Sequence, residues 1–312
     1  MLPAAEHFAR SPEWTWYILF YFFFAGLSGG AYVLATMLRL GGNRADEPAV
    51  RLGYYAAFVT FLVCPVLLTL DLGQPLRFWH MLVNTTPDAT GPTFKSWSPM
   101  SVGSWALLLF GIFVTVSFLE ALIRDRAPQG SVAARAAGLL DGMPGRAWVT
   151  VGSVLGLFVA GYTGVLLAVS NQPVWSDGWA LGGLFLASAL SGTAALLAGL
   201  LRFRPAARAS EGFLALCERL FPLLELALIV VFALTLAPAG TLGQAFGFPW
   251  ILLWLVAFIG LLPGLAGLAV QRLGVTPEGA VVPWTQVAVA APWLVLIGVL
   301  ALRAAVIFSA QA

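Results

Sequence analysis

Eight apolar segments, each long enough to cross a lipid bilayer, limit the folds open to this chain more than any other feature. A transmembrane helix needs about 20 predominantly apolar residues. The segments lie near residues 14–40, 51–72, 99–123, 146–170, 179–201, 212–237, 248–271 and 284–308. Only 10% of the 312 residues are charged, against about 25% in ordinary globular domains. The sequence therefore predicts an all-α integral membrane protein with eight transmembrane helices, embedded in a lipid bilayer and binding no nucleic acid.

Basic residues are distributed unevenly between the two ends of the predicted helices. One end, which holds both termini and the 73–98 loop, carries Arg10, Arg77, Lys95 and Arg303. The other end carries Arg39, Arg44, Arg51, Arg124, Arg126, Arg135, Arg146, Arg202, Arg204, Arg208, Arg219 and Arg272. Cytoplasmic loops carry an excess of Lys and Arg. We therefore expect a multi-pass protein of the cytoplasmic (inner) membrane, with both termini on the outer, periplasmic face.

A repeated motif indicates that the chain contains two related halves. Residues 24–40 and 187–203 align without gaps at an offset of 163, with eight identities that include Arg39 and Arg202. Four predicted helices separate the copies, so both copies run in the same direction through the membrane. This arrangement is typical of a parallel duplication. It predicts two four-helix bundles, at 1–170 and 171–312, although small-residue helices can also resemble one another by chance.

Metal-ligating residues are scarce. The chain has two histidines, His7 and His80, and two cysteines, Cys64 and Cys217. A pair of bis-histidine haems needs four histidines, an iron–sulfur cluster needs about four thiolates, and no Cys or His pair has the spacing of a zinc site. We therefore expect no haem, iron–sulfur cluster or zinc in this chain. A redox role would use a diffusible cofactor or a partner's metal centres.

Polar residues inside predicted membrane segments are candidates for function, because they are costly there unless paired or hydrated. Asp71 ends the second segment, and Arg77 and His80 follow in the loop. An Asp71–Arg77 ion pair that fixes the start of the loop is one interpretation. The other is a polar wall that binds a ligand headgroup and exchanges protons. From the rise of a helix, Tyr21 lies about 10 Å and Tyr162 about 13 Å below the same surface, so these groups can share one level.

Three glutamates are further candidates for proton transfer. Glu120 precedes Arg124 by one helical turn, a spacing typical of an ion pair. Glu218 and Glu225 are seven residues apart on the sixth segment, and hence on one helix face. Glu225 has no cation one turn away, so it is either a proton relay or a locally satisfied glutamate.

At these residues the sequence resembles the NrfD-like membrane subunits of polysulfide reductase and related molybdenum or iron–sulfur respiratory enzymes. The stretches that carry the resemblance are FFFAGLSGGAY, LDLGQPLRFWHML, SPMSVGSWALLLFG and GYTGVLLAVSNQPVWSDGWALGGLFLASALSG. They cover about the N-terminal two thirds, and their order and spacing are more specific than each stretch alone.

The resemblance implies a quinone site near the outer face, in the first four-helix bundle. It also implies electron exchange with an iron–sulfur subunit and a molybdopterin-type catalytic subunit, and no haem in the chain. The family's quinone-contacting tyrosine corresponds to Tyr162. The family's first-helix asparagine and histidine correspond to Ile18 and Tyr21. This sequence departs from the pattern there, because Ile18 cannot form a hydrogen bond and only Tyr21 can.

These observations predict a quinone-binding membrane anchor of a respiratory oxidoreductase, a quinone-reactive or non-catalytic subunit with no catalytic residue assigned. The quinone, menaquinone or ubiquinone, is expected to meet Tyr162, Tyr21, Asp71, Arg77 and His80, with Asp71 exchanging protons and the 73–98 loop docking the iron–sulfur subunit. A proton- or solute-translocating subunit using Glu218 and Glu225 is the alternative. A structural anchor with no ligand is a third reading.

Overall fold

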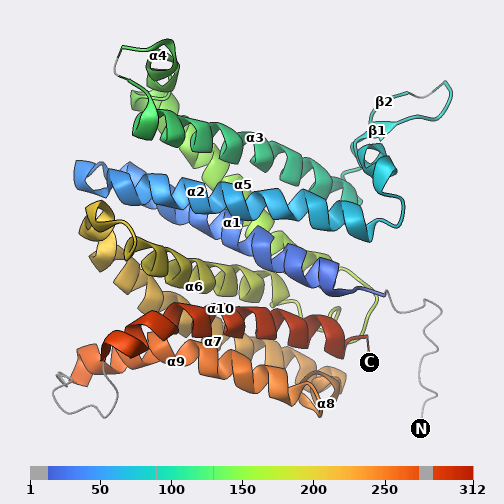
Figure 1. Cartoon of the computed structure of the whole chain (residues 1–312). Helices are drawn as coiled ribbons and strands as arrows, with labels where there is room; N and C mark the ends of the chain where they lie inside the picture. Colours follow the sequence, from blue (N-terminus) through green and yellow to red (C-terminus); the bar gives the residue numbers. More distant parts are fainter. Residues whose placement is uncertain (1–12, 89, 129, 274–283, 312) are drawn as a thin grey trace, which may run out of the picture.

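A computed structural model of the chain describes residues 13–88, 90–128, 130–273 and 284–311. For residues 268–273 and 284–289 it describes the backbone alone. His7 and Arg10 lie outside these residues. The long helices run side by side, roughly parallel or antiparallel to one another (Figure 1). They are α1 (Trp16–Gly41), α2 (Glu47–Asp71), α3 (Pro99–Arg126), α5 (Gly142–Ala168), α6 (Leu181–Leu201), α7 (Glu211–Ala239), α9 (Ile251–Leu273) and α10 (Trp284–Ser309). Each of these helices coincides, to within a few residues, with a segment that the hydropathy of the sequence predicted.

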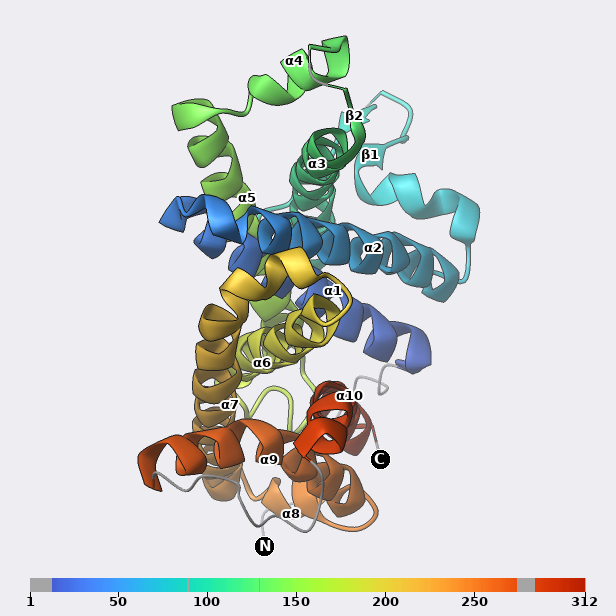
Figure 2. The same cartoon turned by 60° about the vertical axis from the view of Figure 1, so that its left-hand side comes forward.

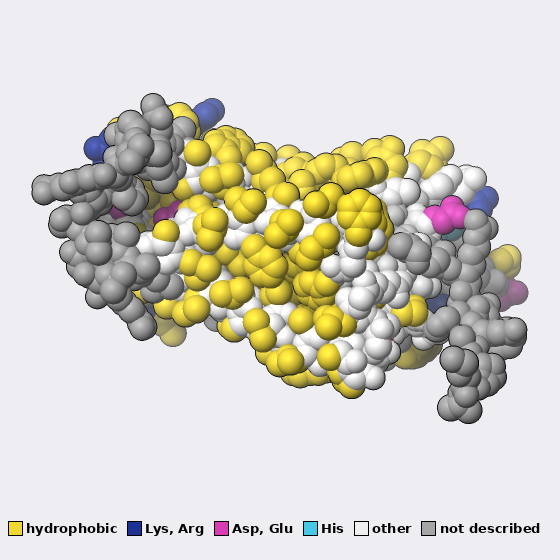
Figure 3. All heavy atoms as spheres, turned by 90° about the horizontal axis from the view of Figure 1, so that it is seen from below, with side chains coloured by type: hydrophobic (Ala, Val, Ile, Leu, Met, Phe, Trp, Pro, Cys, Tyr) yellow, Lys and Arg dark blue, Asp and Glu magenta, His cyan; other side chains and the backbone are white. Residues whose placement is uncertain are grey.

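Seven helices are long and apolar enough, over the described residues, to cross a membrane. The helix outside this count is α9, whose described apolar part is Ile251–Gly267. The all-α integral membrane fold is therefore confirmed, whereas an eighth crossing remains a prediction. Hydrophobic side chains cover the middle of the face shown in Figure 3, and charged side chains lie toward its two ends. This banded surface is what a bilayer requires of a spanning protein.

Short elements connect the long helices. They are η1 (Arg44–Asp46), η2 (Pro75–Met81), β1 (Val83–Asn84), β2 (Gly91–Pro92), α4 (Val132–Gly138), η3 (Pro205–Ser210) and α8 (Leu242–Phe246). Strands β1 and β2 form an antiparallel hairpin in which Val83 pairs with Pro92. The turn from α2 into η2 passes through Gly73, whose φ of +68° favours glycine.

The two ends of the bundle differ in what they carry. The start of α1, the C-terminus and the β1–β2 hairpin lie at one end, which we call the terminal face (Figure 1). There the Gln311 side chain joins the ends of the chain, accepting from the Trp14 amide at 2.7 Å and donating to its carbonyl at 3.2 Å. The opposite end, which we call the arginine face, holds α4, η1 and η3. Placing the terminal face outward remains a prediction.

The copies of the repeated motif pack against each other where α1 meets α6. Gly26 faces Ala189, and Gly30 faces Thr193, whose hydroxyl would clash with a Cβ at Gly30. In each pair the two residues occupy equivalent positions of the repeat, offset by 163. Contacts between equivalent residues are what a two-fold axis between two halves produces. Helix α1 also packs on α2 and α5, as α6 does on α7 and α10 (Figure 2). These contacts support a duplication, with bundles at 1–170 and 171–312 as the proposed units.

One residue was assigned to the wrong environment. Arg303 was counted among the basic residues of the terminal face, but it is fully buried in α10. Its guanidinium donates to the Phe185 carbonyl at 3.1 Å and lies over the Phe185 ring at 5.2 Å. The hydropathy pattern could not reveal this, because a single arginine near a helix end can extend to either surface or inward.

Candidate ligand cavity and ionic network

A cavity of about 370 Å³ lies at the terminal face, among the ends of α1, α2, α3 and α5. We call it the tyrosine cavity. It is lined by Trp14, Ile18, Tyr21, Phe22, Phe61, Pro65, Leu68, Thr69, Asp71, Leu72, Phe78, Met81, Leu82, Met100, Gly103, Ser104, Leu107, Leu108, Tyr162 and Leu166. Its volume falls within the usual range of small-molecule sites, about 300–1,000 Å³. An apolar wall with few polar groups is also typical of such sites.

Tyr162 reaches the cavity from α5 across the first turns of α3. Its hydroxyl donates a hydrogen bond to the Pro99 carbonyl, and its ring stacks on Phe158 at 5.3 Å. The ring lies directly against the backbone at Gly103, where an added Cβ would approach the ring to 2.5 Å. Glycine at this position therefore allows the tyrosine ring to lie between α3 and α5.

Tyr21 contributes a polar group from α1. The side chain is buried, with 6% of its surface exposed, and it lies near Cys64 and Tyr162. Within the described part of the chain, no hydrogen bond to its hydroxyl is found. Buried tyrosines usually have a hydrogen-bond partner, so this hydroxyl is available to a ligand. Ile18 lies one turn earlier and lines the same cavity as an apolar residue.

Asp71 lies at the mouth of the tyrosine cavity, at the last residue of α2. The carboxylate is half-buried and lies beside the Thr15 hydroxyl, which also caps the start of α1. Among the described residues it forms no ion pair, so the ion pair with Arg77 that we considered is absent. A half-buried carboxylate at a cavity mouth can exchange protons with both the cavity and the solvent.

Arg77 and His80 do not line the tyrosine cavity. Both lie on η2, which contributes Phe78 and Met81 to the wall instead. The His80 ring packs edge-on against Trp79 at 4.1 Å and is exposed. Residues three apart share a face of a 3-10 helix, so Phe78 and Met81 face the cavity together, whereas Arg77 and His80 are exposed on another face.

Most of the apolar lining was not predicted from the sequence, and two of these residues matter for the shape of the cavity. Trp14 stacks on buried Trp175 at 5.0 Å and forms part of the cavity wall. Gly103 lies within the stretch SPMSVGSWALLLFG, and its place against the Tyr162 ring was not predicted. The signal was present for Gly103, since that stretch opens the third segment at the level of the tyrosines.

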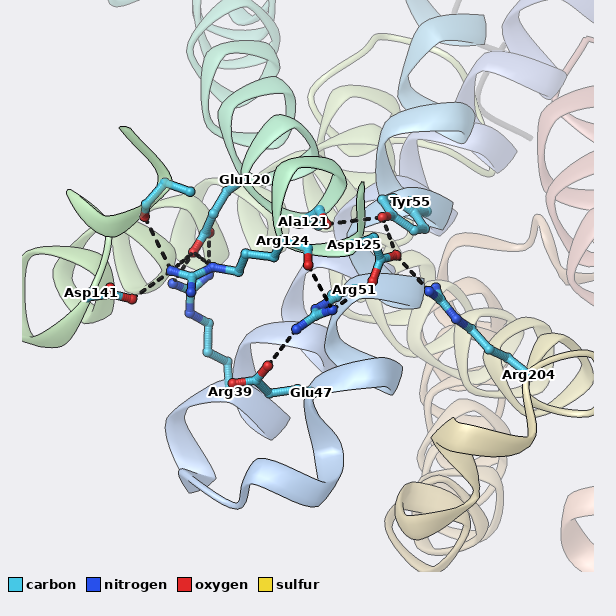
Figure 4. A network of polar contacts seen from close by, with 11 residues as sticks. Arg39, Glu47, Arg51, Tyr55, Glu120, Ala121, Arg124, Asp125, Asp141 and Arg204 are labelled. Atoms are coloured by element: carbon cyan, nitrogen blue, oxygen red, sulfur yellow. Dashed lines mark hydrogen bonds and ion pairs between the residues drawn. The ribbon is translucent and has the colours of Figure 1, made fainter. Parts of the chain in front are cut away.

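Glu120 is the centre of an ionic network at the arginine face (Figure 4). Arg39 holds its carboxylate with two hydrogen bonds, of 2.6 and 2.7 Å. The expected pair with Arg124 also forms, at 2.9 Å, and Arg124 extends to Asp141 at 2.6 Å. The Glu120 side chain is only 3% exposed. Two cations therefore hold this carboxylate in place, which favours the ion-pair interpretation.

A second part of the network is centred on Asp125. It accepts from Arg51 at 2.7 Å, from Arg204 at 2.6 Å and from the Tyr55 hydroxyl at 2.5 Å. Arg51 also pairs with Glu47. Arg204 comes from the connection after α6, so Asp125 joins the two halves of the chain at this end (Figure 4).

Glu218 and Glu225 lie on α7, away from the tyrosine cavity. Glu218 is half-buried near Arg202 and Arg219. Glu225 is 1% exposed, and its electrostatic partner is Arg303. Glu225 Oε2, Arg303 Nε and Nη1, and Ser191 Oγ are buried without a hydrogen-bond partner among the described residues. The cation that Glu225 lacks in its own helix thus comes from α10.

No group of three potential metal ligands is present in the described part of the chain. The expectation that the chain holds no metal of its own stays a prediction.

The fold and the cavity define an α-helical integral membrane protein with an apolar, tyrosine-bearing site at one end of its helices. The chain matches the family described as Polysulphide reductase, NrfD, over residues 5–312. The chain therefore belongs to the NrfD family, as its sequence motifs predicted.

Individual relatives match over parts of their lengths. A polysulfide reductase chain of Wolinella succinogenes is 30% identical over 61% of this chain and 59% of its own length. A selenate reductase subunit of Mesobacillus selenatarsenatis is 30% identical over 35% of this chain and 22% of its own length. Protein NrfD of Escherichia coli is 27% identical over 62% of this chain and 60% of its own length. The matches thus span less than two thirds of each relative.

Proposed function

We propose that this chain is the quinone-binding membrane anchor of a respiratory oxidoreductase, and that the quinone ring occupies the tyrosine cavity. The observation that carries the proposal is the convergence of Tyr21, Asp71 and Tyr162 on one apolar cavity. The relatives named as subunits of polysulfide and selenate reductases support the class of complex.

The cavity suits a flat ring with an apolar tail. Its wall is apolar apart from a few polar groups, of which Thr69 and Ser104 already bond backbone carbonyls of their own helices. Leu72, Phe78 and Met100 line the cavity and are also more than 40% exposed. An apolar tail can therefore leave between α2, η2 and α3 toward the lipid. Both menaquinone and ubiquinone fit this description.

A bound quinone would supply two-electron, two-proton redox chemistry. The chain's own part is to bind the ring and move protons. The Tyr21 hydroxyl donates to one ring oxygen. While the Tyr162 hydroxyl donates its hydrogen bond to the Pro99 carbonyl, its oxygen accepts from a ring hydroxyl. Rotation of the phenolic O–H toward the ring turns Tyr162 into a donor. Asp71 passes protons between the cavity and the terminal face, as a carboxylate within reach of both can do.

Electrons require a partner, because the chain is expected to hold no metal. We propose that an iron–sulfur subunit docks on the 73–98 loop and passes electrons to or from a molybdopterin-type subunit. The loop presents Leu76, Phe94 and Trp97, which are 89%, 59% and 80% exposed, directly beside the cavity. In this arrangement eight helices cross the cytoplasmic membrane and the terminal face is periplasmic. Arg77 and His80, exposed on η2, then belong to the docking surface.

The test is a Tyr21→Phe and a Tyr162→Phe variant of the complex, with Tyr17→Phe as the matched control. Tyr17 is on the same helix but 45% exposed and outside the cavity. We expect both cavity variants to lower quinol-coupled electron transfer and co-purified quinone, with the control unchanged. Full activity and quinone content in both cavity variants would refute the site.

A second candidate function is translocation of protons or a solute through the second half, using Glu218 and Glu225. Buried Glu225 and Arg303, which both have side-chain atoms without a hydrogen-bond partner among the described residues, favour it, since such groups need water or a ligand. Proton uptake by proteoliposomes that is lost in Glu225→Gln, while quinone content is retained, would support this function. Unchanged uptake would exclude it.

A further inference from the structure

A second cavity, of about 230 Å³, lies at the arginine face, at the opposite end of the first bundle from the tyrosine cavity. We call it the arginine pocket. The end of α1, the start of α2, the end of α3 and the start of α5 surround it. Five arginines line it against three acidic residues. The pocket therefore has an excess of two positive charges, which selects an anion.

Three of these arginines are already engaged. Arg39 and Arg124 hold Glu120, and Arg51 joins Asp125 to Glu47 (Figure 4). The other two, Arg44 and Arg146, form no ion pair with any residue that the structure describes, and both are exposed at the pocket. A guanidinium presents five N–H donors in a planar fork that matches phosphate oxygens. The two free arginines thus provide the donors that a phosphate group needs.

The first turn of α5 adds to this environment. Its N-cap residue, Asp141, makes no capping hydrogen bond, because its carboxylate binds Arg124 instead. Asp141, Gly142 and Arg146 all line the pocket. The N-terminus of a helix of 27 residues favours an anion through its dipole and its free N–H groups. The engaged arginines fix the pocket's shape, while the free groups remain for a ligand.

The rim of the pocket indicates where the phosphate comes from. Leu40, Leu139 and Met143 are 42%, 75% and 75% exposed, and each directly precedes or follows a pocket residue in the sequence. Exposed apolar side chains would not contact a free phosphate favourably, whereas they would pack against the acyl chains of a phospholipid. Basic pockets between transmembrane helices bind anionic lipid headgroups in this way. We propose that the arginine pocket binds a phosphate group, that of an anionic phospholipid headgroup.

The test uses the purified full-length chain in neutral detergent, stripped of lipid. Arg44→Gln, Arg146→Gln and the double variant are compared with an Arg126→Gln/Arg135→Gln control, whose arginines are exposed at the same face but lie outside the pocket. The probes are phosphatidylglycerol, phosphatidylcholine, inorganic phosphate and glycerol 3-phosphate. Native mass spectrometry measures the binding of the two lipids. The shift of the unfolding temperature measures the binding of all four probes.

We expect phosphatidylglycerol to bind the wild type and the control, and the double variant to bind it about thirtyfold more weakly, from about 1 kcal/mol per arginine. Phosphatidylcholine should not show this dependence. If inorganic phosphate or glycerol 3-phosphate shows the same loss and phosphatidylglycerol does not, the phosphate site stands and its lipid source is overturned. Equal binding of every probe to the double variant and the control overturns the site. The single variants provide the same comparison should the double variant not fold.

Discussion

The Tyr162 hydroxyl of α5 donates a hydrogen bond to the Pro99 carbonyl in the first turn of α3. This contact fixes the phenol at the boundary between the two helices, with its oxygen toward the tyrosine cavity. A ligand that competes for the phenolic proton must displace the carbonyl, whereas a ligand that donates to the oxygen need not. The geometry thus makes Tyr162 an adaptable group for the oxidised and the reduced form of a ring.

Tyr162→Phe should lower kcat/KM for quinol about tenfold, because one hydrogen bond of about 1.4 kcal/mol is lost. The unfolding temperature should change little, since the phenylalanine ring keeps its stacking on Phe158. Steady-state quinol oxidation by the complex measures the first, and thermal unfolding the second. A large loss of stability would show that the residue is structural.

Gly103→Ala should close part of the tyrosine cavity while every tyrosine remains. The new Cβ would lie 2.5 Å from the Tyr162 ring, which must move. We expect a lower quinone content per purified chain, measured by solvent extraction. Gly212→Ala is the matched control, since nothing lies within 4 Å of its Cβ. Equal quinone content in the two variants would contradict the proposal that the quinone ring binds in the tyrosine cavity.

Asp71→Asn should slow turnover and leave binding intact. An amide cannot take up a proton, and a positioned acid–base group contributes about a hundredfold or more to a rate. We expect a turnover number lower by about that factor, with quinone content unchanged. Glu211→Gln, an exposed acidic residue outside both the cavity and the 73–98 loop, should have no effect. A normal turnover number in Asp71→Asn would assign proton transfer to another group.

Glu120→Gln should destabilise the chain by about 2–4 kcal/mol, because it leaves the Arg39 guanidinium partly buried without its carboxylate. Replacing both residues by methionine should cost less than the single change. The exposed Arg208–Glu211 pair, at 4.0 Å, is the control, and Glu211→Gln should cost less than about 1 kcal/mol. Thermal unfolding in detergent measures all three. A double variant less stable than Glu120→Gln would argue against this account of the pair.

The sequence predicted the depth of each residue along its helix better than the contacts between side chains of different helices. The rise of a helix placed Tyr21 and Tyr162 at one depth, and both line one cavity. The Glu120–Arg124 pair followed from spacing, but the shorter contact to Arg39 did not, because it joins α1 to α3. Arg303 was misassigned for the same reason. Its carbonyl partner on α6 and the Glu225 carboxylate on α7 become visible only when the helices are packed.

The central claim is that the ring of a quinone occupies the tyrosine cavity, and photoaffinity labelling of the purified complex with an azidoquinone tests it most directly. We predict labelled peptides from 14–22, 61–72 and 100–108, with labelling competed by excess unmodified quinone and reduced in Gly103→Ala. Competed labelling confined to peptides of α6, α7 or α10, with none in these three stretches, would contradict the account.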